Sequence, residues 1–447
     1  MKKLIFLLSF ITAFNFTASA ETINLEQMRL LALANSRSLA KYDLSLKSSL
    51  LEEKTRLFAL LPSVSANYNA GISYLDKNWA FVNPLENYSA GARLSLTQKI
   101  FEGGRNLIHK SLSSISTDSV RNEALAEYFN VLDSADKAYY SALEAAKNLK
   151  NAELSLNTAV LSLSIAEIRK NSGMLNQGEY LKALAEKESR ENSRNQARRN
   201  LTLANNKIKL LTGLSEVPEL EPISFDTYNT ALEYLSGISD TEADVLFEKL
   251  YELIAKTNPA LARAAYNRLK AEKNLALSKR EAIPSINATI FTADLSYSPK
   301  DGFISKSGGG IYLSGNIPLD FWVLNNKIEK SKIAVNSASI EYINAEKSLE
   351  TELYNTLINI FTQAGAVLSS RRTVEYSEKH LEFVTERYKL SQSSVSDLSD
   401  ALALASSAGI QLVRSEYGFL QSLSSLRSLA VIEDEEKLMH ILTGGIR

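Results

Sequence analysis

The sequence predicts a mainly α-helical protein with a small β part, in which long antiparallel helices pack side by side. Two very long segments, 85–217 and 319–447, contain no proline, and residues 105–172 contain neither proline nor glycine. If it is helical throughout, 105–172 forms a rod of roughly 100 Å, at about 1.5 Å per residue. A rod of that length needs partner helices along its sides.

The second observation is an internal duplication. Three stretches align in order: 61–66 with 283–288 at an offset of 222 residues, 101–111 with 321–331 at an offset of 220, and 169–173 with 387–391 at an offset of 218. The slowly falling offset indicates two copies of one unit, with small insertions or deletions between them. Each copy is expected to hold a helix that ends at a proline, two strands, a long helix, a short tip and a return helix.

The N-terminus has the pattern of a signal peptide, which we place at residues 1–20. Met1-Lys2-Lys3 is basic, 4–14 is apolar, and Ala18-Ser19-Ala20 is a cleavage signal. The apolar run is too short for a membrane anchor, which needs roughly 20 residues. The mature chain is expected to begin at Glu21, outside the cytoplasm, and no later segment reads as a transmembrane helix.

The two copies then follow in order along the chain. The first copy, 21–213, is expected to contain a helix at about 24–61, strands at about 63–75 and 88–101, a long helix at about 105–172 and a return helix at about 179–212. A connector at 214–242 leads to the second copy, 243–431, with a helix at about 243–282, strands at about 285–297 and 309–319, a long helix at about 326–390 and a return helix at about 396–431. The C-terminal segment is 432–447.

The strands alternate between apolar and polar residues. In the first, one face carries Val64, Ala66, Tyr68, Ala70, Ile72 and Tyr74, and the other carries serine, asparagine and glycine. A period of two predicts β-strands, and about ten residues is also the length of a tilted strand that crosses a bilayer. Two ordinary solvent-facing hairpins are the alternative. Within lipid an open sheet edge is not tolerated and a barrel needs at least about eight strands, so four strands per chain would require sister copies.

Composition excludes several classes of protein. The chain has no cysteine, which excludes disulfides and thiolate metal sites. Its 50 basic and 51 acidic residues are interspersed, which argues against nucleic acid as a partner. The three histidines lie far apart and have no second ligand at metal spacing. No nucleophile, phosphate-loop or zinc motif occurs, so we expect neither an enzyme nor a cofactor.

The whole mature chain resembles the TolC-like outer-membrane efflux proteins. The resemblance rests on the duplicated unit and on the residues Leu61-Pro62, Ile283-Pro284, Ile100-Phe101-Glu102-Gly103-Gly104, Gly173, Tyr388, Asp397 and Asp400. It implies a homotrimer with a periplasmic α-barrel continued by a shared 12-stranded outer-membrane β-barrel, four strands coming from each chain. It further implies a passive export duct that works with a periplasmic adaptor protein and, indirectly, with an inner-membrane pump of RND or ABC type, in tripartite efflux or type I secretion.

The family's entrance motif, Tyr-x-x-Gly-x-x-x-x-x-Asp-x-x-Asp, corresponds here to Tyr388, Ser391, Asp397 and Asp400. By resemblance, the two aspartates form stacked acidic rings at a narrow, gated periplasmic mouth and set its cation preference. Residues i and i+3 share a helix face, and threefold symmetry turns each carboxylate into a ring of the kind that cation pores use. Asp397 could equally complete an N-terminal cap with Ser394, and the two roles are compatible.

Two departures from the family concern the contacts that close the mouth. Gly178 and Glu179 stand where the family usually has a small hydroxyl residue and Asp, which leaves a Glu179–Tyr388 contact feasible. Ser393 stands where members with a lock between neighbouring subunits carry Arg, so that ion pair cannot form with Ser393. Arg387 or Lys389 could replace it.

The two tips also resemble the surface that docks the periplasmic adaptor in this family. The residues concerned are Gly173, Met174, Leu175, Ser391 and Ser394. The alternative is that small residues there only permit a tight turn between helices.

Outside the channel interpretation, a periplasmic coiled-coil structural or adaptor protein without a channel remains the alternative function. It predicts a soluble species, whereas the channel predicts a protein of the cell outer membrane whose helical part lies in the periplasm. The sequence does not distinguish small-molecule efflux from protein secretion.

Overall fold

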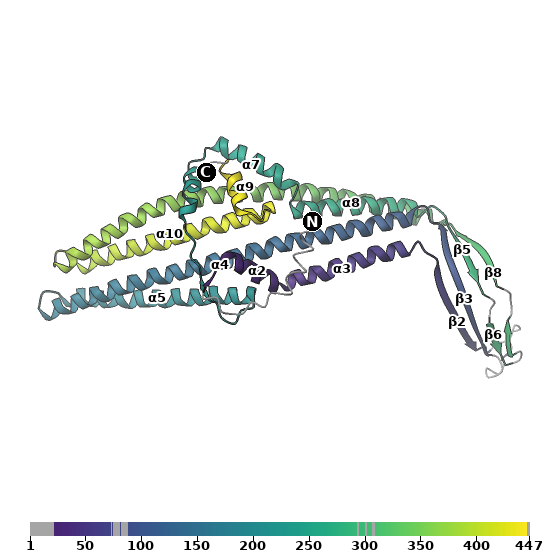
Figure 1. Cartoon of the computed structure of the whole chain (residues 1–447), viewed down its shortest axis with the longest axis horizontal. Coiled ribbons are helices and arrows are strands. Elements are labelled where there is room, and N and C mark those ends of the chain that lie inside the picture. The colour runs from purple at the N-terminus through teal and green to yellow at the C-terminus, as the bar shows by residue number, and fades with distance from the viewer. Residues whose placement is uncertain are drawn as a thin grey trace. The chain divides into compact units, whose positions relative to one another are not determined.

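The computed structural model describes residues 22–72, 74, 81, 88–292, 295–299, 302–305 and 309–444, so the expected signal peptide at 1–20 lies outside the described residues. Within them the chain is mainly helical with a small β part, as the sequence predicts (Figure 1). The chain divides into two compact units. The first holds the described residues of 1–41, 124–259 and 346–447, and the second holds those of 42–123 and 260–345.

The helices are α2 (Leu25–Asn35), α3 (Arg37–Phe58), α4 (Arg105–Asn171), α5 (Gln177–Thr212), the 3₁₀ helix η2 (Asp226–Tyr228), α6 (Asn229–Ser236), α7 (Asp240–Ala255), α8 (Pro259–Arg280), α9 (Phe321–Lys389), α10 (Val395–Ala430) and α11 (Glu435–Leu442). The strands are β1 (Thr22–Ile23), β2 (Ser63–Ile72), β3 (Tyr88–Phe101), β4 (Glu219–Leu220), β5 (Ser285–Phe291), β6 (Leu295–Ser298), β7 (Gly302–Ser305) and β8 (Gly310–Asn316). In the part of the chain that the structure describes, no helix combines the length and apolar character needed to cross a membrane.

The single helices expected at 24–61 and 243–282 are each two helices, so these predictions are wrong. Between α2 and α3 the backbone of Ser36 is extended, with φ −70° and ψ 106°, and its Oγ accepts the N–H of Leu39 at 3.3 Å. α8 begins at Pro259, which has no N–H and fits the first position of a new helix. Arg37 and Pro259 are equivalent at the offset of 222 residues, so the break belongs to both copies.

The copies differ where the second strand leads into the long helix. Gly103 and Gly104 have φ of 61° and 75°, a left-handed corner that glycine adopts without strain. In the second copy the N–H groups of Val323 and Leu324 bond to the Asp320 carbonyl at 3.0 and 3.2 Å. Without a glycine corner α9 begins at once, before the start expected near residue 326.

In the second unit the six longer strands form one antiparallel sheet. β2 pairs with β3, whose first part pairs with β6 and whose last part pairs with β5. β5 then pairs with β8, and β6 pairs with β7. The strand expected at 285–297 is therefore interrupted after Phe291, and the strand expected at 309–319 ends at Asn316 because Pro318 cannot donate to the ladder. The six strands therefore form four rows: β2, β3, β5 with β6, and β8 with β7.

The two faces of this sheet differ in chemistry. Cross-strand partners share a face. One face is mainly apolar and carries Val64, Ala66, Tyr68, Ala70, Ile72, Tyr88, Ala90, Ala92, Leu94, Leu96, Ala288, Ile290, Leu295, Tyr297, Phe303, Ile311 and Leu313, together with the polar residues Gln98 and Ser305. On the other face the hydroxyls of Ser65 and Ser95 lie 2.8 Å apart, and those of Thr97 and Thr289 lie 3.1 Å apart. Phe291 interrupts this polar face as the sequence indicates, with its ring centroid 5.8 Å from that of Tyr312.

Within the second unit each long helix packs on the helix that precedes its strands. The hydroxyl of Thr117 on α4 donates to the carbonyl of Ser49 on α3 at 3.4 Å. Ser278 on α8 and Ser331 on α9 share a hydrogen bond of 2.9 Å. The same pairing therefore recurs in both copies, which is what a duplicated unit predicts.

In the first unit a single buried carboxylate joins the N-terminal helix to the long helices. Asp136 on α4 has no exposed surface. Its Oδ1 accepts from Arg29 Nε of α2 at 2.6 Å, and its Oδ2 accepts from Arg427 and from the Ser424 hydroxyl of α10, the latter at 2.9 Å. Arg427 is buried and Arg29 is half-buried, and removal of one partner from a buried ion pair leaves an uncompensated charge.

Replacement of Asp136 by Asn should therefore destabilise the chain strongly. The Asp136→Asn variant keeps the volume but leaves Arg29 and Arg427 without their buried anion, at an expected cost of about 3–5 kcal/mol in the free energy of unfolding. Urea unfolding followed by helical circular dichroism measures it. Glu375→Gln, which breaks an exposed i,i+4 pair with Lys379, is the control and should change little. Equal stability of the two variants would contradict the role given to Asp136.

Candidate functional site at the helix tips

The first tip joins α4 to α5 through a left-handed residue. Gly173 has φ 73°, its N–H bonds to the Lys170 carbonyl at 3.0 Å, and the N–H of Met174 bonds to the Arg169 carbonyl at 2.8 Å. This pair of bonds is the Schellman end of a helix. The side chain of Asn176 then accepts the Glu179 N–H at 2.8 Å and starts α5.

The second tip, between α9 and α10, repeats this turn with a serine in the glycine position. Ser391 has φ 62°, its N–H bonds to the Tyr388 carbonyl at 3.1 Å, and the N–H of Gln392 bonds to the Arg387 carbonyl at 2.8 Å. A residue with a Cβ is strained in this conformation. The two tips therefore share one turn geometry at equivalent residues.

At the start of α10, Asp397 forms the cap that the sequence allowed. The Ser394 N–H donates to Asp397 Oδ2 at 2.9 Å, and the Ser394 hydroxyl accepts the Asp397 N–H at 3.1 Å. The backbone bond first, and then the hydroxyl, hold the pKa of the Asp397 carboxyl below its ordinary value of 3.8. Asp400 lies three residues further along the same helix, and both carboxylates are exposed. The arrangement offers two neighbouring negative charges, one of them fixed by the cap.

Tyr388 lies at the centre of the packing between two helical hairpins, α4–α5 and α9–α10. It is completely buried, and its hydroxyl donates to the Ser162 carbonyl of α4 at 3.3 Å. The guanidinium of Arg169 lies 4.5 Å from the centre of the Tyr388 ring and donates to the Tyr388 carbonyl. Burial raises the pKa of the Tyr388 phenol, so the tyrosine acts here as a neutral packing residue with one donor.

Glu179 bonds to the second hairpin, but not to Tyr388. Its Oε2 accepts the N–H of Val395, the first residue of α10, at 3.3 Å. Among the described residues no hydrogen bond joins Glu179 to Tyr388, so the feasible contact suggested by the sequence is replaced by a different one. Gly178 is exposed, and a Cβ there would come within 3.2 Å of the Asn176 side chain.

No replacement for the missing arginine lock occurs within the described residues of one chain. The Ser393 hydroxyl donates to the Val384 carbonyl of its own hairpin at 3.3 Å. Arg387 is exposed and donates to the Gln392 carbonyl at 2.9 Å, while Lys389 pairs with Glu386 at 2.8 Å. Within one chain, Arg387 and Lys389 therefore contact residues of their own hairpin, and their use between subunits stays a prediction.

The five residues considered for docking divide into two groups. Gly173, Met174 and Ser391 are exposed, Met174 to 75%. Leu175 packs against a core cluster made by all four helices, and Ser394 holds the α10 cap. The buried members of that cluster are Ala166, Ala183, Val384, Tyr388, Val395, Leu398 and Ala401.

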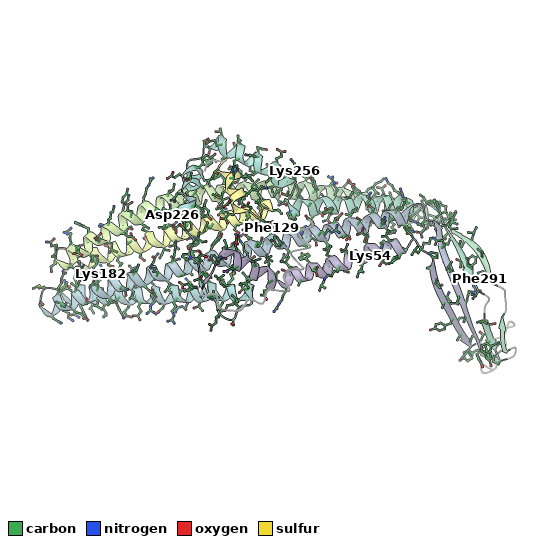
Figure 2. The ribbon with its side chains drawn as sticks, viewed as in Figure 1. Lys54, Phe129, Lys182, Asp226, Lys256 and Phe291 are labelled. Atoms are coloured by element: carbon green, nitrogen blue, oxygen red, sulfur yellow. The ribbon has the colours of Figure 1, made fainter. Side chains whose placement is uncertain are left out.

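Sequence reasoning missed three residues that join the hairpins. Arg169 and Ser162 hold Tyr388, and the Lys182 ammonium donates to the Ser396 hydroxyl at 2.6 Å. Figure 2 labels Lys182 on α5. The alignment of the copies placed Arg169 opposite Arg387 but carries no signal of burial. In the described part of the chain, no group of three or more histidine or acidic residues is arranged to hold a metal ion.

The Asp397 cap makes a pH-dependent prediction. Asp397→Asn keeps an acceptor oxygen but removes the charge. Because the folded pKa lies below 3.8, the ionised carboxylate stabilises the fold at higher pH, and this contribution is lost as the pH falls through the folded pKa. Thermal melts should show a less stable variant at neutral pH, and the two melting temperatures should converge in acid. Asp400→Asn is the control. A gap that persists unchanged into acid would contradict the assignment.

Comparison with known proteins agrees with this geometry. A model of the family described as outer membrane efflux protein matches residues 29–214 and 250–430, one segment for each copy. Among solved structures, CusC is 16% identical with a TM-score of 0.76, over 94% of this chain and 95% of that one. VceC of Vibrio cholerae is 15% identical with a TM-score of 0.74, over 91% and 95%, and CmeC of Campylobacter jejuni is 15% identical with a TM-score of 0.74, over 95% and 90%. No curated protein sequence matches. These likenesses establish the fold, and the family match covers most of the sequence: the chain belongs to the outer membrane efflux protein family.

Proposed function

We propose that the chain is the outer-membrane export duct of a tripartite efflux system, a passive channel and not an enzyme. The observation that carries the proposal is the six-stranded sheet, with one mainly apolar face and, among the described strands, open edges at β2, β7 and β8. Family membership supports the same function. The duct would lie in the outer membrane, with its long helices in the periplasm.

The apolar face of the sheet supports a position in lipid. Its large side chains lie open, with 72% exposure for Val64, 89% for Tyr68 and 72% for Ile311. Nothing within the described residues covers them. A soluble protein rarely leaves so large an apolar face in water, whereas a membrane strand places such residues against the acyl chains.

The open edges support assembly with further copies. Among the described strands, β2 pairs only with β3, β8 only with β5, and β7 only with β6. Unpaired backbone groups are not tolerated in lipid, and a membrane barrel needs at least about eight strands. Because β5 and β6 lie in one row of the sheet and β8 and β7 in the next, each chain supplies four rows. Three copies would supply twelve rows and would join each β2 to the row of β8 and β7 of a neighbour. We therefore propose the homotrimer that the family resemblance implies.

The helices of the first unit support the same assembly. Several apolar side chains on α4, α5, α9 and α10 are exposed, among them Leu161, Ile168, Leu181, Leu184, Phe383, Leu404 and Ile410. Neighbouring copies would bury them. Threefold symmetry would then bring three Asp397 and three Asp400 side chains around one axis. We propose these two rings as the cation-preferring entrance of the duct.

Two features support the proposed partners: the sequence has no nucleotide-binding motif, and residues at the helix tips are exposed. The sequence contains no nucleotide-binding motif, so an inner-membrane pump, of RND or ABC type, would supply the energy. A periplasmic adaptor would dock on the exposed tip residues Gly173, Met174 and Ser391. A soluble coiled-coil spacer is the second candidate, but it gives no role to the apolar face of the sheet.

The proposed duct predicts a detergent-dependent oligomer that conducts ions. The purified mature chain should need detergent, migrate as a heat-sensitive trimer on denaturing gels, and produce stepwise conductance in planar bilayers. The same preparation, boiled before reconstitution, is the control and should not conduct. A water-soluble monomer without conductance would contradict the duct and favour the spacer.

The acidic rings predict the ion preference of that conductance. The double variant Asp397→Asn/Asp400→Asn should lower cation selectivity and weaken block by a trivalent cation such as hexaamminecobalt, because six carboxylates leave the entrance. Reversal potentials in a salt gradient measure it. Glu375→Gln/Glu382→Gln, two exposed acids elsewhere on α9, is the matched control. Selectivity equal to that of the parent would remove the ring assignment.

A further inference from the structure

Among the described residues, four polar contacts near the tips join the helical hairpin α4–α5 to the helical hairpin α9–α10 of the same chain. They are Arg169 to the Tyr388 carbonyl, the Tyr388 hydroxyl to the Ser162 carbonyl, Glu179 to the Val395 N–H, and Lys182 to the Ser396 hydroxyl. The first two hold one residue, Tyr388, at both its backbone and its phenol. Both of these contacts come from α4.

Arg169 is the most deeply buried charged residue in this set. Its side chain lies in the last turn of α4, and the residue is 9% exposed. The planar guanidinium covers the Tyr388 ring and donates from its edge to the Tyr388 carbonyl. A cation over an aromatic face binds more strongly when water is excluded, and only arginine combines stacking with an in-plane donor. The contacts of Glu179 and Lys182 are more exposed to water.

The equivalent arginine of the second copy makes no such contact. Arg387 corresponds to Arg169 at the offset of 218 residues. It is exposed, donates to the Gln392 carbonyl of its own turn, and lies over the Phe383 ring of its own helix at 5.7 Å. The contact is therefore a specialisation of the first copy and not a general property of the turn.

We propose that Arg169 is the positioning residue that fixes the distance between the two hairpins of one chain and so sets the resting width of the entrance. This inference rests on the proposed function, because it takes the tips to be the mouth of a duct. Moving α9 away from α4 uncovers the Tyr388 ring and hydrates the Arg169 guanidinium together. The structure holds the covered contact, and its release would accompany a wider mouth.

The first experiment measures the distance between the tips directly. The chain has no cysteine, so spin labels at Met174→Cys and Gln392→Cys report on the two tips alone. Trimers are assembled with an excess of unlabelled chain, so that each holds one labelled copy. The parent should give a narrow distance distribution. Arg169→Ala should shift it to longer distances and broaden it, and Arg387→Ala, the equivalent charge removal, should leave it unchanged.

The second experiment measures conductance in planar bilayers. Arg169→Ala should raise the resting conductance, Arg169→Lys should give an intermediate value because it keeps the charge without the planar fork, and Arg387→Ala should match the parent. Cross-linking Lys182→Cys to Ser396→Cys with a short bis-maleimide should return the Arg169→Ala variant to low conductance. A residue that only stabilises the helices would lower the melting temperature without this rescue.

The proposal is overturned if Arg169→Ala leaves both distance and conductance unchanged, or if Arg169→Ala and Arg387→Ala change them equally. If Arg169→Ala does not assemble, unchanged distance and conductance in Arg169→Lys overturn it instead. A parent chain that forms no channel would contradict the proposed function. The distances between the spin labels would still test the contact between Arg169 and Tyr388.

Discussion

Helices of 67 and 69 residues impose the constraint on which the other features of this chain depend. Backbone hydrogen bonds alone do not stabilise a helix in water, so each must bury one side along its length. In the second unit α4 packs on α3 and α9 packs on α8, while in the first unit all four of α4, α5, α9 and α10 share one core cluster. Each long helix thus uses two shorter partners. The flanks that remain apolar and uncovered are the surfaces left for other copies.

Duplication supplied two similar tips, whose equivalent carboxylates make different contacts. Glu179 and Asp397 are equivalent residues, each third in its helix. The shorter Asp397 folds back on Ser394 and completes a capping box. The longer Glu179 leaves its own cap to Asn176 and reaches the Val395 N–H of the other hairpin. Both carboxylates accept an N–H at the start of α10, Asp397 from Ser394 and Glu179 from Val395. Of the two, only Glu179 links the two helical hairpins.

Much of the fold could be predicted because helix-breaking residues and the alternation of apolar and polar residues are local features of the sequence. The absence of proline predicted both long helices, the absence of glycine supported the first of them, and the period of two predicted the strands. The break at Ser36 was not readable, because serine is tolerated inside helices and only its hydroxyl bond to Leu39 reveals the new start. The acid pair was predicted from its spacing and the family motif. Arg169 was not, because an arginine in the last turn of a helix is ordinarily solvated, and its burial depends on the neighbouring hairpin.

The cap and the proposed ring at Asp397 reinforce each other. A carboxylate on a flexible exposed side chain would present a diffuse charge to a passing ion, whereas the Ser394 N–H fixes one oxygen of Asp397 at 2.9 Å and leaves the residue exposed. The same bond lowers the pKa of the carboxyl, so the charge persists at a pH where an ordinary aspartate begins to protonate. A helix cap is thus a physical means of building a fixed negative charge at an entrance. It needs no partner cation, which would cancel the charge that the entrance requires.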